Sequence, residues 1–284
     1  MDVGLLMLAG GVAAGAFGSL LGLGGGLLIV PLLTLGFGLP LREAVGVSLV
    51  CVIVTSSASA GVYLQRRQAN LRLGMVLELF TGLGAIVGGA IAFLIDERLL
   101  AGLFALLLAY VAVTMVRGVR RPTQLLTADE ASQAADAVLA REDHDLVALP
   151  AEVRGLGLDP ERERHLPAAS LASIGAGVAS ALLGIGGGLV KVPVMHLLLG
   201  VPLRIATATS NLMVGITAST SAIVYLLRGG IDAYAAGPTA IGVFLGASLG
   251  SRLGHRVDAR LLRLLFVAVL VYTAIEMARR AVSP

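Results

Sequence analysis

The chain has 284 residues, of which 57% are hydrophobic and only 14% charged, and its mean hydropathy is +0.91. This balance excludes an ordinary soluble domain and indicates a polytopic membrane protein. The net charge of +3 does not indicate nucleic-acid binding, because most arginines flank apolar segments, which is the pattern of membrane topology. The single cysteine, Cys51, excludes an internal disulfide.

Eight apolar segments follow one another along the chain. They cover residues 3–38, 44–64, 73–95, 99–116, 168–200, 205–227, 233–251 and 261–278. A bilayer crossing needs about 20 residues, which suits most of them. The first segment is too long for one crossing, because a helix of that length would measure about 54 Å against a hydrocarbon core of about 30 Å. It also lacks the basic start and cleavage pattern of a signal peptide, so we expect it to be retained.

The two long segments each contain a run of glycines, GLGGG at 22–26 and GIGGG at 184–188. Because glycine destabilises a helix interior, we expect each segment to fold as two short helices that meet at the glycines. The second run lies 162 positions after the first. The same offset pairs Pro31 with Pro193, Ser48 with Ser210, Thr55 with Thr217, Gly84 with Gly246 and Tyr110 with Tyr272. We therefore predict two homologous membrane repeats, residues 1–117 and 168–284, joined by a linker at 118–167.

The arginines favour opposite orientations for the two repeats. If each broken segment turns back within the membrane, each repeat crosses three times and the second is inverted; if it crosses twice, the repeats are parallel. If the arginines at the start of the linker are counted and those further along it are not, inversion puts eleven arginines on the cytoplasmic side and five on the other, against nine and seven for the parallel arrangement. We predict an all-α polytopic membrane protein of two inverted repeats, each a broken, re-entrant helix pair plus three membrane-crossing helices, which is typical of secondary transporters.

The linker differs from both repeats in composition, because it holds ten of the 18 acidic residues of the chain. Thr127 and Glu130 have the spacing of a helix capping box, which predicts a partly helical segment. Its place between arginine-flanked segment ends predicts a cytoplasmic location.

The glycine runs have two interpretations. Small residues let membrane helices pack closely, which explains the glycines without any ligand. Alternatively, the breaks expose backbone N–H groups and helix N-termini that attract an anion. The candidate ligands in this second interpretation are Gly24, Gly25, Gly26, Gly186, Gly187 and Gly188. A phosphate loop is poorly supported, because no Gly-Lys-Ser/Thr follows either run.

Lys191 is the only lysine of the chain and lies three residues after the second glycine run, where the first repeat has Ile29. A charge at membrane depth costs about 3 kcal/mol or more. Either the side chain snorkels to a lipid headgroup, or it lies in a substrate cavity and binds an anion.

The second segment of each repeat is rich in hydroxyl groups. Ser48 and Thr55 are seven residues apart and share a helix face, as do their copies Ser210 and Thr217. With Asn211 they are candidate ligands for a small oxyanion. Hydrogen bonding between helices is the alternative and explains most of these hydroxyls.

Catalytic and metal-binding motifs are not found in the sequence, which has neither His-Glu-x-x-His nor Cys-x-x-Cys. Glu78, whose copy is Ala240, is expected at the level of the lipid headgroups rather than as a proton carrier. We therefore predict that the protein is not an enzyme and uses no cofactor.

Leu-Gly-Leu/Ile-Gly-Gly-Gly followed by a proline, then Ala-x-x-x-Ser and a Ser/Thr cluster, occurs in both repeats. This doubled motif resembles the TauE/SafE family of sulfite exporters, also called the toluene-sulfonate uptake permease family. The resemblance covers residues 5–117 and 168–280. It implies a prokaryotic plasma-membrane secondary transporter without an ATPase subunit, acting on sulfite, thiosulfate, sulfoacetate or a similar anion. It also implies a site near the glycine runs that includes Ser48, Ser210 and Asn211, whereas Lys191 is particular to this sequence.

We predict export of sulfite or an organosulfonate by alternating access, with the lipid bilayer and a sulfur oxyanion as partners and no nucleic acid. A potential of 100 mV, negative inside, favours export of each negative charge by about 2.3 kcal/mol. Uptake of thiosulfate or another sulfur anion, an anion channel of the same fold, and a membrane enzyme or sensor that uses the linker remain as alternatives. The coupling ion and the oligomeric state, a homodimer included, stay open.

Overall fold

The computed structural model describes residues 2–20, 26–65, 69–120, 164–253 and 259–282. Within these ranges the chain is helical and has no strand. The first repeat comprises α1 (Asp2–Leu20), α2 (Gly26–Pro31), the π-helical turn η1 (Leu32–Gly36), α3 (Leu41–Gln65), α4 (Leu71–Leu94) and α5 (Glu97–Arg120). The second comprises α8 (Leu166–Leu183), α9 (Gly188–Pro193), η3 (Val194–Leu198), α10 (Leu203–Leu227), α11 (Ala233–Leu253) and α12 (Ala259–Val282).

The helix boundaries repeat with the offset seen in the sequence. The pairs α2 and α9, α3 and α10, and α5 and α12 each begin and end 162 residues apart. The internal duplication is therefore present in the helices as well as in the sequence. The division at residues 117 and 168 stays a prediction, as does everything expected of linker residues 121–163, which lie outside the described part of the chain.

The second glycine run breaks its helix, as the sequence predicts. Gly184 ends α8 with a φ of +68°, and Gly186 and Gly187 follow with φ of +74° and +77°. These left-handed conformations are accessible to glycine and unfavourable for other residues, which is why the helix stops here. In the first repeat, α1 ends at Leu20 and α2 begins at Gly26; Gly24 and Gly25 lie outside the described residues.

Among the described residues, four helices are long and apolar enough to cross a membrane. They cover Leu71–Leu94, Glu97–Val116, Leu166–Leu183 and Ile205–Leu227. Large apolar side chains also point outward, for example Leu79 on α4 and Leu106 on α5, each 71% exposed. A soluble protein avoids such apolar surfaces, whereas a bilayer covers them. The chain is therefore an all-α polytopic membrane protein, as predicted.

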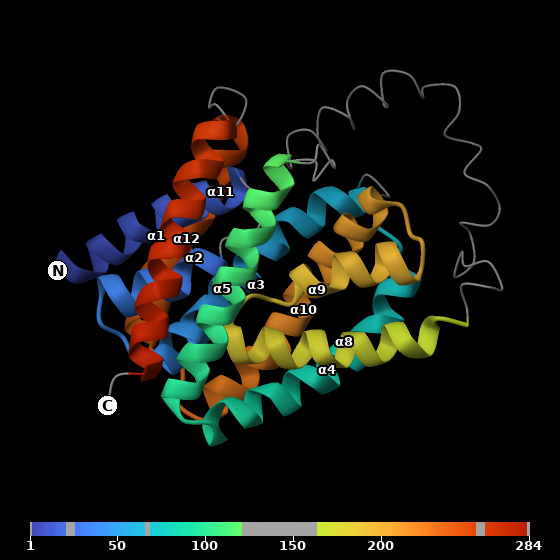
Figure 1. Ribbon diagram of the computed structural model, residues 1–284, viewed down its shortest axis with the longest axis horizontal. Coiled ribbons are helices and arrows are strands. Elements are labelled where there is room, and N and C mark those ends of the chain that lie inside the picture. The colour runs from blue at the N-terminus through green and yellow to red at the C-terminus, as the bar shows by residue number, and fades with distance from the viewer. Residues whose placement is uncertain (1, 21–25, 66–68, 121–163, 254–258, 283–284) are drawn as a thin grey trace.

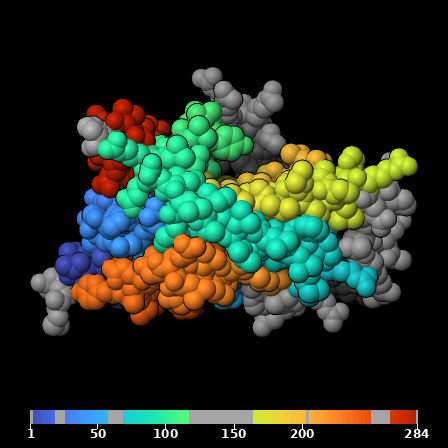
Figure 2. Space-filling view, turned by 90° about the horizontal axis from the view of Figure 1, so that it is seen from below, coloured from blue at the N-terminus to red at the C-terminus, as the bar shows by residue number. Residues whose placement is uncertain are grey.

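Two helix pairs join the repeats through close glycine contacts. Helix α4 packs along α8, and the corresponding helices α11 and α1 pack in the same way (Figure 1). A Cβ atom placed on Gly84 would lie 2.1 Å from the carbonyl oxygen of Ile174. Its counterpart on Gly246 would lie 2.0 Å from that of Val12. The two pairs therefore share one geometry, and α4 and α8 lie side by side on the face shown in Figure 2.

Corresponding helices run in opposite directions where they meet. In Figure 1, α5 rises from its start near the bottom, whereas α12 beside it descends toward the C-terminus. Helices α3 and α10 are also antiparallel, because Gly46 near the start of α3 approaches Gly230 beyond the end of α10, and Ser56 further along approaches Gly215 in its middle. The orientation of each repeat across the bilayer stays a prediction.

Candidate functional site

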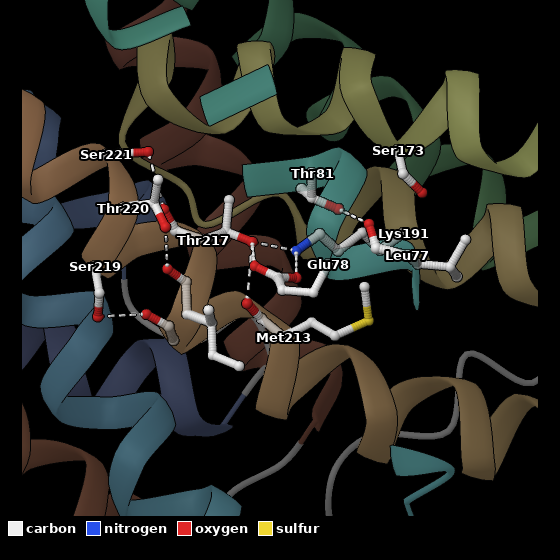
Figure 3. A network of polar contacts seen from close by, with 12 residues as sticks. Leu77, Glu78, Thr81, Ser173, Lys191, Met213, Thr217, Ser219, Thr220 and Ser221 are labelled. Atoms are coloured by element: carbon white, nitrogen blue, oxygen red, sulfur yellow. Dashed lines mark hydrogen bonds and ion pairs between the residues drawn. The ribbon is translucent and has the colours of Figure 1, made fainter. Parts of the chain in front are cut away.

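The most unusual polar group of the described chain is an ion pair inside the protein. Lys191 of α9 extends its ammonium group to Glu78 of α4, with 3.0 Å between Nζ and Oε2 (Figure 3). Thr217 of α10 accepts a hydrogen bond from the same ammonium group. Its own hydroxyl lies 2.6 Å from Oε1 of Glu78. Three helices from both repeats therefore meet at one charged cluster.

All three side chains are removed from the surface of the protein. Lys191 is 1% exposed, Glu78 7% and Thr217 0%. Snorkelling of Lys191 to a lipid headgroup does not occur, because its ammonium group is enclosed. The expectation for Glu78 is wrong for the same reason: its carboxylate is buried against a cation and does not face the headgroups. A buried charge costs several kcal/mol, on the order of 3 or more, unless it is paired, and each partner here supplies the pairing of the other.

Thr217 has two acceptors within reach of its one hydroxyl hydrogen. Its Oγ1 lies 2.6 Å from Glu78 Oε1 and 3.0 Å from the carbonyl oxygen of Met213, one turn earlier in α10. A hydroxyl donates one hydrogen and accepts through two lone pairs. Thr217 can therefore turn its hydrogen from one oxygen to the other while it keeps its bond from Lys191.

A second buried polar group lies beside the glycine break. Ser180 of α8 is 0% exposed, and its hydroxyl has no hydrogen-bond partner in the part of the chain that the structure describes. A Cβ atom on Gly187 would lie 3.3 Å from the Cβ of Ser180 and 3.6 Å from Cε of Lys191. The absent side chain of Gly187 thus leaves Ser180 and Lys191 on either side of the same turn. A buried hydroxyl without a partner is rare and costs about 1–3 kcal/mol, which makes Ser180 a candidate ligand residue.

Ser48 connects the breaks of the two repeats. Its hydroxyl lies 3.1 Å from the carbonyl oxygen of Gly26 at the start of α2 and 2.8 Å from that of Gly184 at the end of α8. The start of α2 and the second glycine turn therefore lie close together. The Ser48 hydroxyl donates to these carbonyl oxygens and so holds the start of α2 against the second glycine turn.

The other predicted ligands lie on α3 and α10 at varying distances from these contacts. Ser210 is buried, and its Oγ would lie 3.5 Å from a Cβ atom on Gly188, the first residue of α9. Asn211 is half-buried on the same helix. Thr55 is half-buried and donates to carbonyl oxygens of its own helix, at Cys51 and Val52. The structure thus brings Thr217 together with Lys191, and Ser210 together with the second glycine turn.

Most other hydroxyls of α10 do not connect helices. Ser219, Thr220 and Ser221 each donate to the carbonyl oxygen four residues earlier in the same helix, over 2.8–3.0 Å. The expectation of bonds between helices is wrong for these three, because a hydroxyl in an apolar setting can bond to the preceding turn of its own helix. It is confirmed for Thr209, which accepts a hydrogen bond from the backbone N–H of Asn70 at the start of α4. No group of three His, Cys, Asp or Glu side chains that would suit a metal ion occurs among the described residues.

Glu78 and Ser180 were missed as site residues in the sequence, although one signal was available. Neither residue of the ion pair has a charged counterpart in the other repeat, since Lys191 corresponds to Ile29 and Glu78 to Ala240. Those two counterparts belong to the main hydrophobic core. A cation and an anion that both lack a copy in an apolar setting are expected to pair, because neither is stable alone. Ser180 carries no comparable signal, because serine is common in membrane helices.

Comparison with known proteins agrees with this architecture. The family profile described as "Sulfite exporter TauE/SafE" matches residues 7–277. The chain belongs to the TauE/SafE family. This is a family of membrane transporters, so the ion pair and the glycine turn lie in a transporter of the TauE/SafE type.

Several relatives of the TauE/SafE chain carry transporter descriptions. "Probable membrane transporter protein YunE" of Bacillus subtilis (strain 168) is 24% identical over 231 residues, which are 78% of each chain. A "Probable membrane transporter protein" of Xylella fastidiosa (strain Temecula1) is 31% identical over 208 residues, 73% of this chain and 67% of that one. "Probable membrane transporter protein MamO" of Paramagnetospirillum magneticum is 31% identical over 286 residues, 96% of this chain but 42% of that protein. No solved structure matches the chain.

Proposed function

We propose that the protein is a secondary transporter that carries small sulfur-containing anions, sulfite or an organosulfonate first among them, out of a prokaryotic cell by alternating access. The observation that carries this proposal is the buried lysine beside the glycine turn, flanked by a buried hydroxyl that has no partner among the described residues. The family description, "Sulfite exporter TauE/SafE", supports sulfite as the first anion to test.

The proposed binding site uses Lys191 and Ser180 directly. The ammonium group supplies the opposite charge, and the hydroxyl donates a hydrogen bond to an oxyanion that enters beside Gly187 when the site opens. No side chain caps the start of α9, so backbone N–H groups of the turn are the further anion ligands in this proposal. Gly186, Gly187, Gly188, Ser210 and Asn211 remain candidate ligands of this site. Gly24, Gly25 and Gly26 would contribute in the same way from the first repeat.

Alternating access requires the site to open to one side of the membrane at a time. Lys191 and Glu78 are enclosed here, so an anion reaches them only when α4 moves relative to α9 and α10. The antiparallel course of α5 and α12, and of α3 and α10, supports inverted repeats. Inverted repeats supply two related conformations, one open to each side. The plasma membrane as location, the cytoplasmic linker and the absence of catalysis are part of the same proposal.

The direct test is flux from proteoliposomes that contain the full chain and are loaded with sulfite, thiosulfate or methanesulfonate. We expect saturable efflux of at least one of these anions. Lys191→Met should raise the half-saturating concentration at least tenfold, because it removes the charge and keeps the length of the side chain. Wild-type protein that moves none of the three anions would refute the proposal, and unchanged affinity in the variant would remove Lys191 from the site.

Uptake is the second candidate direction, and the observation that favours it is the buried carboxylate of Glu78. A carboxylate within a membrane protein is the kind of group that takes part in proton relays. An uptake system needs such a group, because the membrane potential opposes the entry of anions. Measuring flux in both directions in the same vesicles distinguishes the two.

A further inference from the structure

The Lys191–Glu78 ion pair joins the two repeats, and the duplicated structure holds no second copy of it, because the corresponding residues are Ile29 and Ala240. It therefore lies between the parts that alternating access would move. We infer that Glu78 is a proton carrier, so that each anion bound at Lys191 crosses the membrane together with one proton bound at Glu78. This inference rests on the proposed function and specifies the ion to which transport is coupled.

An anion and the carboxylate of Glu78 compete for the ammonium group of Lys191. Its ammonium group is occupied by Glu78 Oε2 at 3.0 Å and by Thr217. With Glu78 ionised, the buried pair has no net charge. An anion that joined it would leave one uncompensated negative charge in an enclosed site, which is strongly unfavourable. A proton on Glu78 removes that excess and frees the ammonium group for the anion, so the proton and the anion bind together.

Thr217 lets Glu78 take up the proton without stranding a polar group. While Glu78 is ionised, the threonine hydroxyl donates to Oε1 over 2.6 Å. Once Glu78 is protonated, the carboxyl group donates to Thr217, and the threonine hydrogen turns to the carbonyl oxygen of Met213, 3.0 Å away. Every donor keeps an acceptor in both states, as a buried polar network requires.

Few other charges surround Glu78. Helix α8, which packs along α4, has no titratable side chain along its length. Helix α10 contributes Tyr225, whose hydroxyl donates to the carbonyl oxygen of Ala181 over 2.9 Å. Among the described side chains, Lys191 of α9 is thus the one charged group that contacts Glu78. The side chain of Arg204, also on α10, lies outside the described part of the structure. Ile29 of the first repeat and Ala240 of the second take the symmetry-related places and carry no charge, so one proton accompanies each anion.

The charges of the two moving states follow from this pairing. The loaded site holds neutral Glu78, cationic Lys191 and one monoanion, and the empty site holds ionised Glu78 and cationic Lys191. Neither carries net charge. The proton comes from water on one side and returns to water on the other. The pH difference therefore drives the transport of a monoanion, and the membrane potential, which was expected from the sequence to favour export, does not. Export proceeds when the outward anion gradient exceeds the opposing pH gradient, and uptake proceeds in the reverse case.

Replacement of Glu78 by glutamine predicts a change in the driving force. In Glu78→Gln the loaded site is still neutral, but the empty site carries the charge of Lys191. Each cycle then moves one net charge, so transport should follow the voltage and ignore the pH difference. The variant keeps the shape of the side chain and leaves Lys191 free, so exchange of labelled for unlabelled anion should continue.

The experiment uses proteoliposomes with the full chain, and sulfite and methanesulfonate as probes. Methanesulfonate stays monoanionic over the working pH range, so a change of pH acts on the protein alone. One unit of pH difference should accumulate the probe up to tenfold in wild-type vesicles, whereas a potential of about 59 mV, the equivalent of tenfold for one charge, should not. Glu78→Gln should show the reverse. A matched control is Glu276→Gln on α12, whose carboxylate pairs with exposed Arg279; it should behave as wild type.

Several outcomes would overturn the inference. Wild-type accumulation that follows the potential, or pH-driven accumulation that survives in Glu78→Gln, would exclude Glu78 as the carrier. A double variant, Lys191→Ile with Glu78→Ala, introduces the residue that each position has in the other repeat and leaves no unpaired buried charge. A double variant that folds and still shows normal pH-driven transport would show that the pair has only a structural role. Absence of exchange of both probes by the wild type would instead overturn the proposed function itself.

Discussion

Removing one partner of the Lys191–Glu78 pair should destabilise the protein far more than removing both. In Glu78→Ala the ammonium group of Lys191 stays buried, at 1% exposure, without its counter-ion. Breaking a buried pair in this way costs about 3–5 kcal/mol, whereas replacing both partners by apolar residues is often neutral or stabilises by about 1–4 kcal/mol. The double variant Lys191→Ile with Glu78→Ala should therefore be at least as stable as the wild type.

Cys51 offers a convenient assay for this prediction. It is the only cysteine of the chain and is 0% exposed, so a fluorogenic thiol reagent reacts with it only on unfolding. Melts are recorded in detergent at one heating rate. Because each kcal/mol of lost stability lowers Tm by about 2–4 °C, the loss of about 3–5 kcal/mol in Glu78→Ala should lower Tm by roughly 6–20 °C. The double variant should melt within a few degrees of the wild type or above it. Additive losses from Lys191→Ile and Glu78→Ala would refute the reasoning, because they would mean that the two charges do not stabilise each other.

Three further predictions concern the fold. Gly84→Val should destabilise the protein by about 1–3 kcal/mol, since its Cβ atom would lie 2.1 Å from a carbonyl oxygen of α8. Gly82→Ala on the same helix would place its Cβ atom where no other atom lies within 4 Å, and it should stabilise the protein by about 0.5–1 kcal/mol. Thermal melts check both, and equal shifts in Tm would contradict the packing of α4 on α8. Ser48→Ala should cost about 1–2 kcal/mol by removing the bond between the two glycine breaks, and an unchanged Tm would show that this bond is dispensable. In a background without the natural cysteine, cysteines at Glu97 and Ala259, which correspond between the repeats, should react with an impermeant thiol reagent from opposite sides of the membrane; labelling from one side would exclude inversion.

The sequence predicted much of the architecture, because duplication and hydrophobicity leave strong signals. The offset between Gly184 and its copy recurs in the helix boundaries, and the second glycine run ends α8 as expected. Backbone preference explains this success, since φ values of +68° to +77° suit glycine almost alone. Lys191 and Thr217 were also singled out from the sequence, and the structure places them in contact.

The partner of Lys191 could not be read from local patterns. Glu78 lies 113 residues away and belongs to the other repeat. Its position near the start of an apolar segment is equally typical of a side chain at the membrane surface. The packing of α4 on α10 decides the matter by turning this face of α4 inward. Ser180 escaped for a related reason, because only the packed structure shows that its hydroxyl is enclosed beside Gly187.

The most direct test of the account is a crystal structure of the protein grown with selenite, whose selenium scatters X-rays anomalously. We expect an anomalous peak beside Gly187, with oxyanion oxygens about 3 Å from Lys191 Nζ and Ser180 Oγ, as charge-assisted hydrogen bonds require. The ammonium group should then have left Glu78 Oε2, to which it lies at 3.0 Å without the anion. A selenium peak elsewhere in the protein, with Lys191 still on Glu78, would contradict the proposed site.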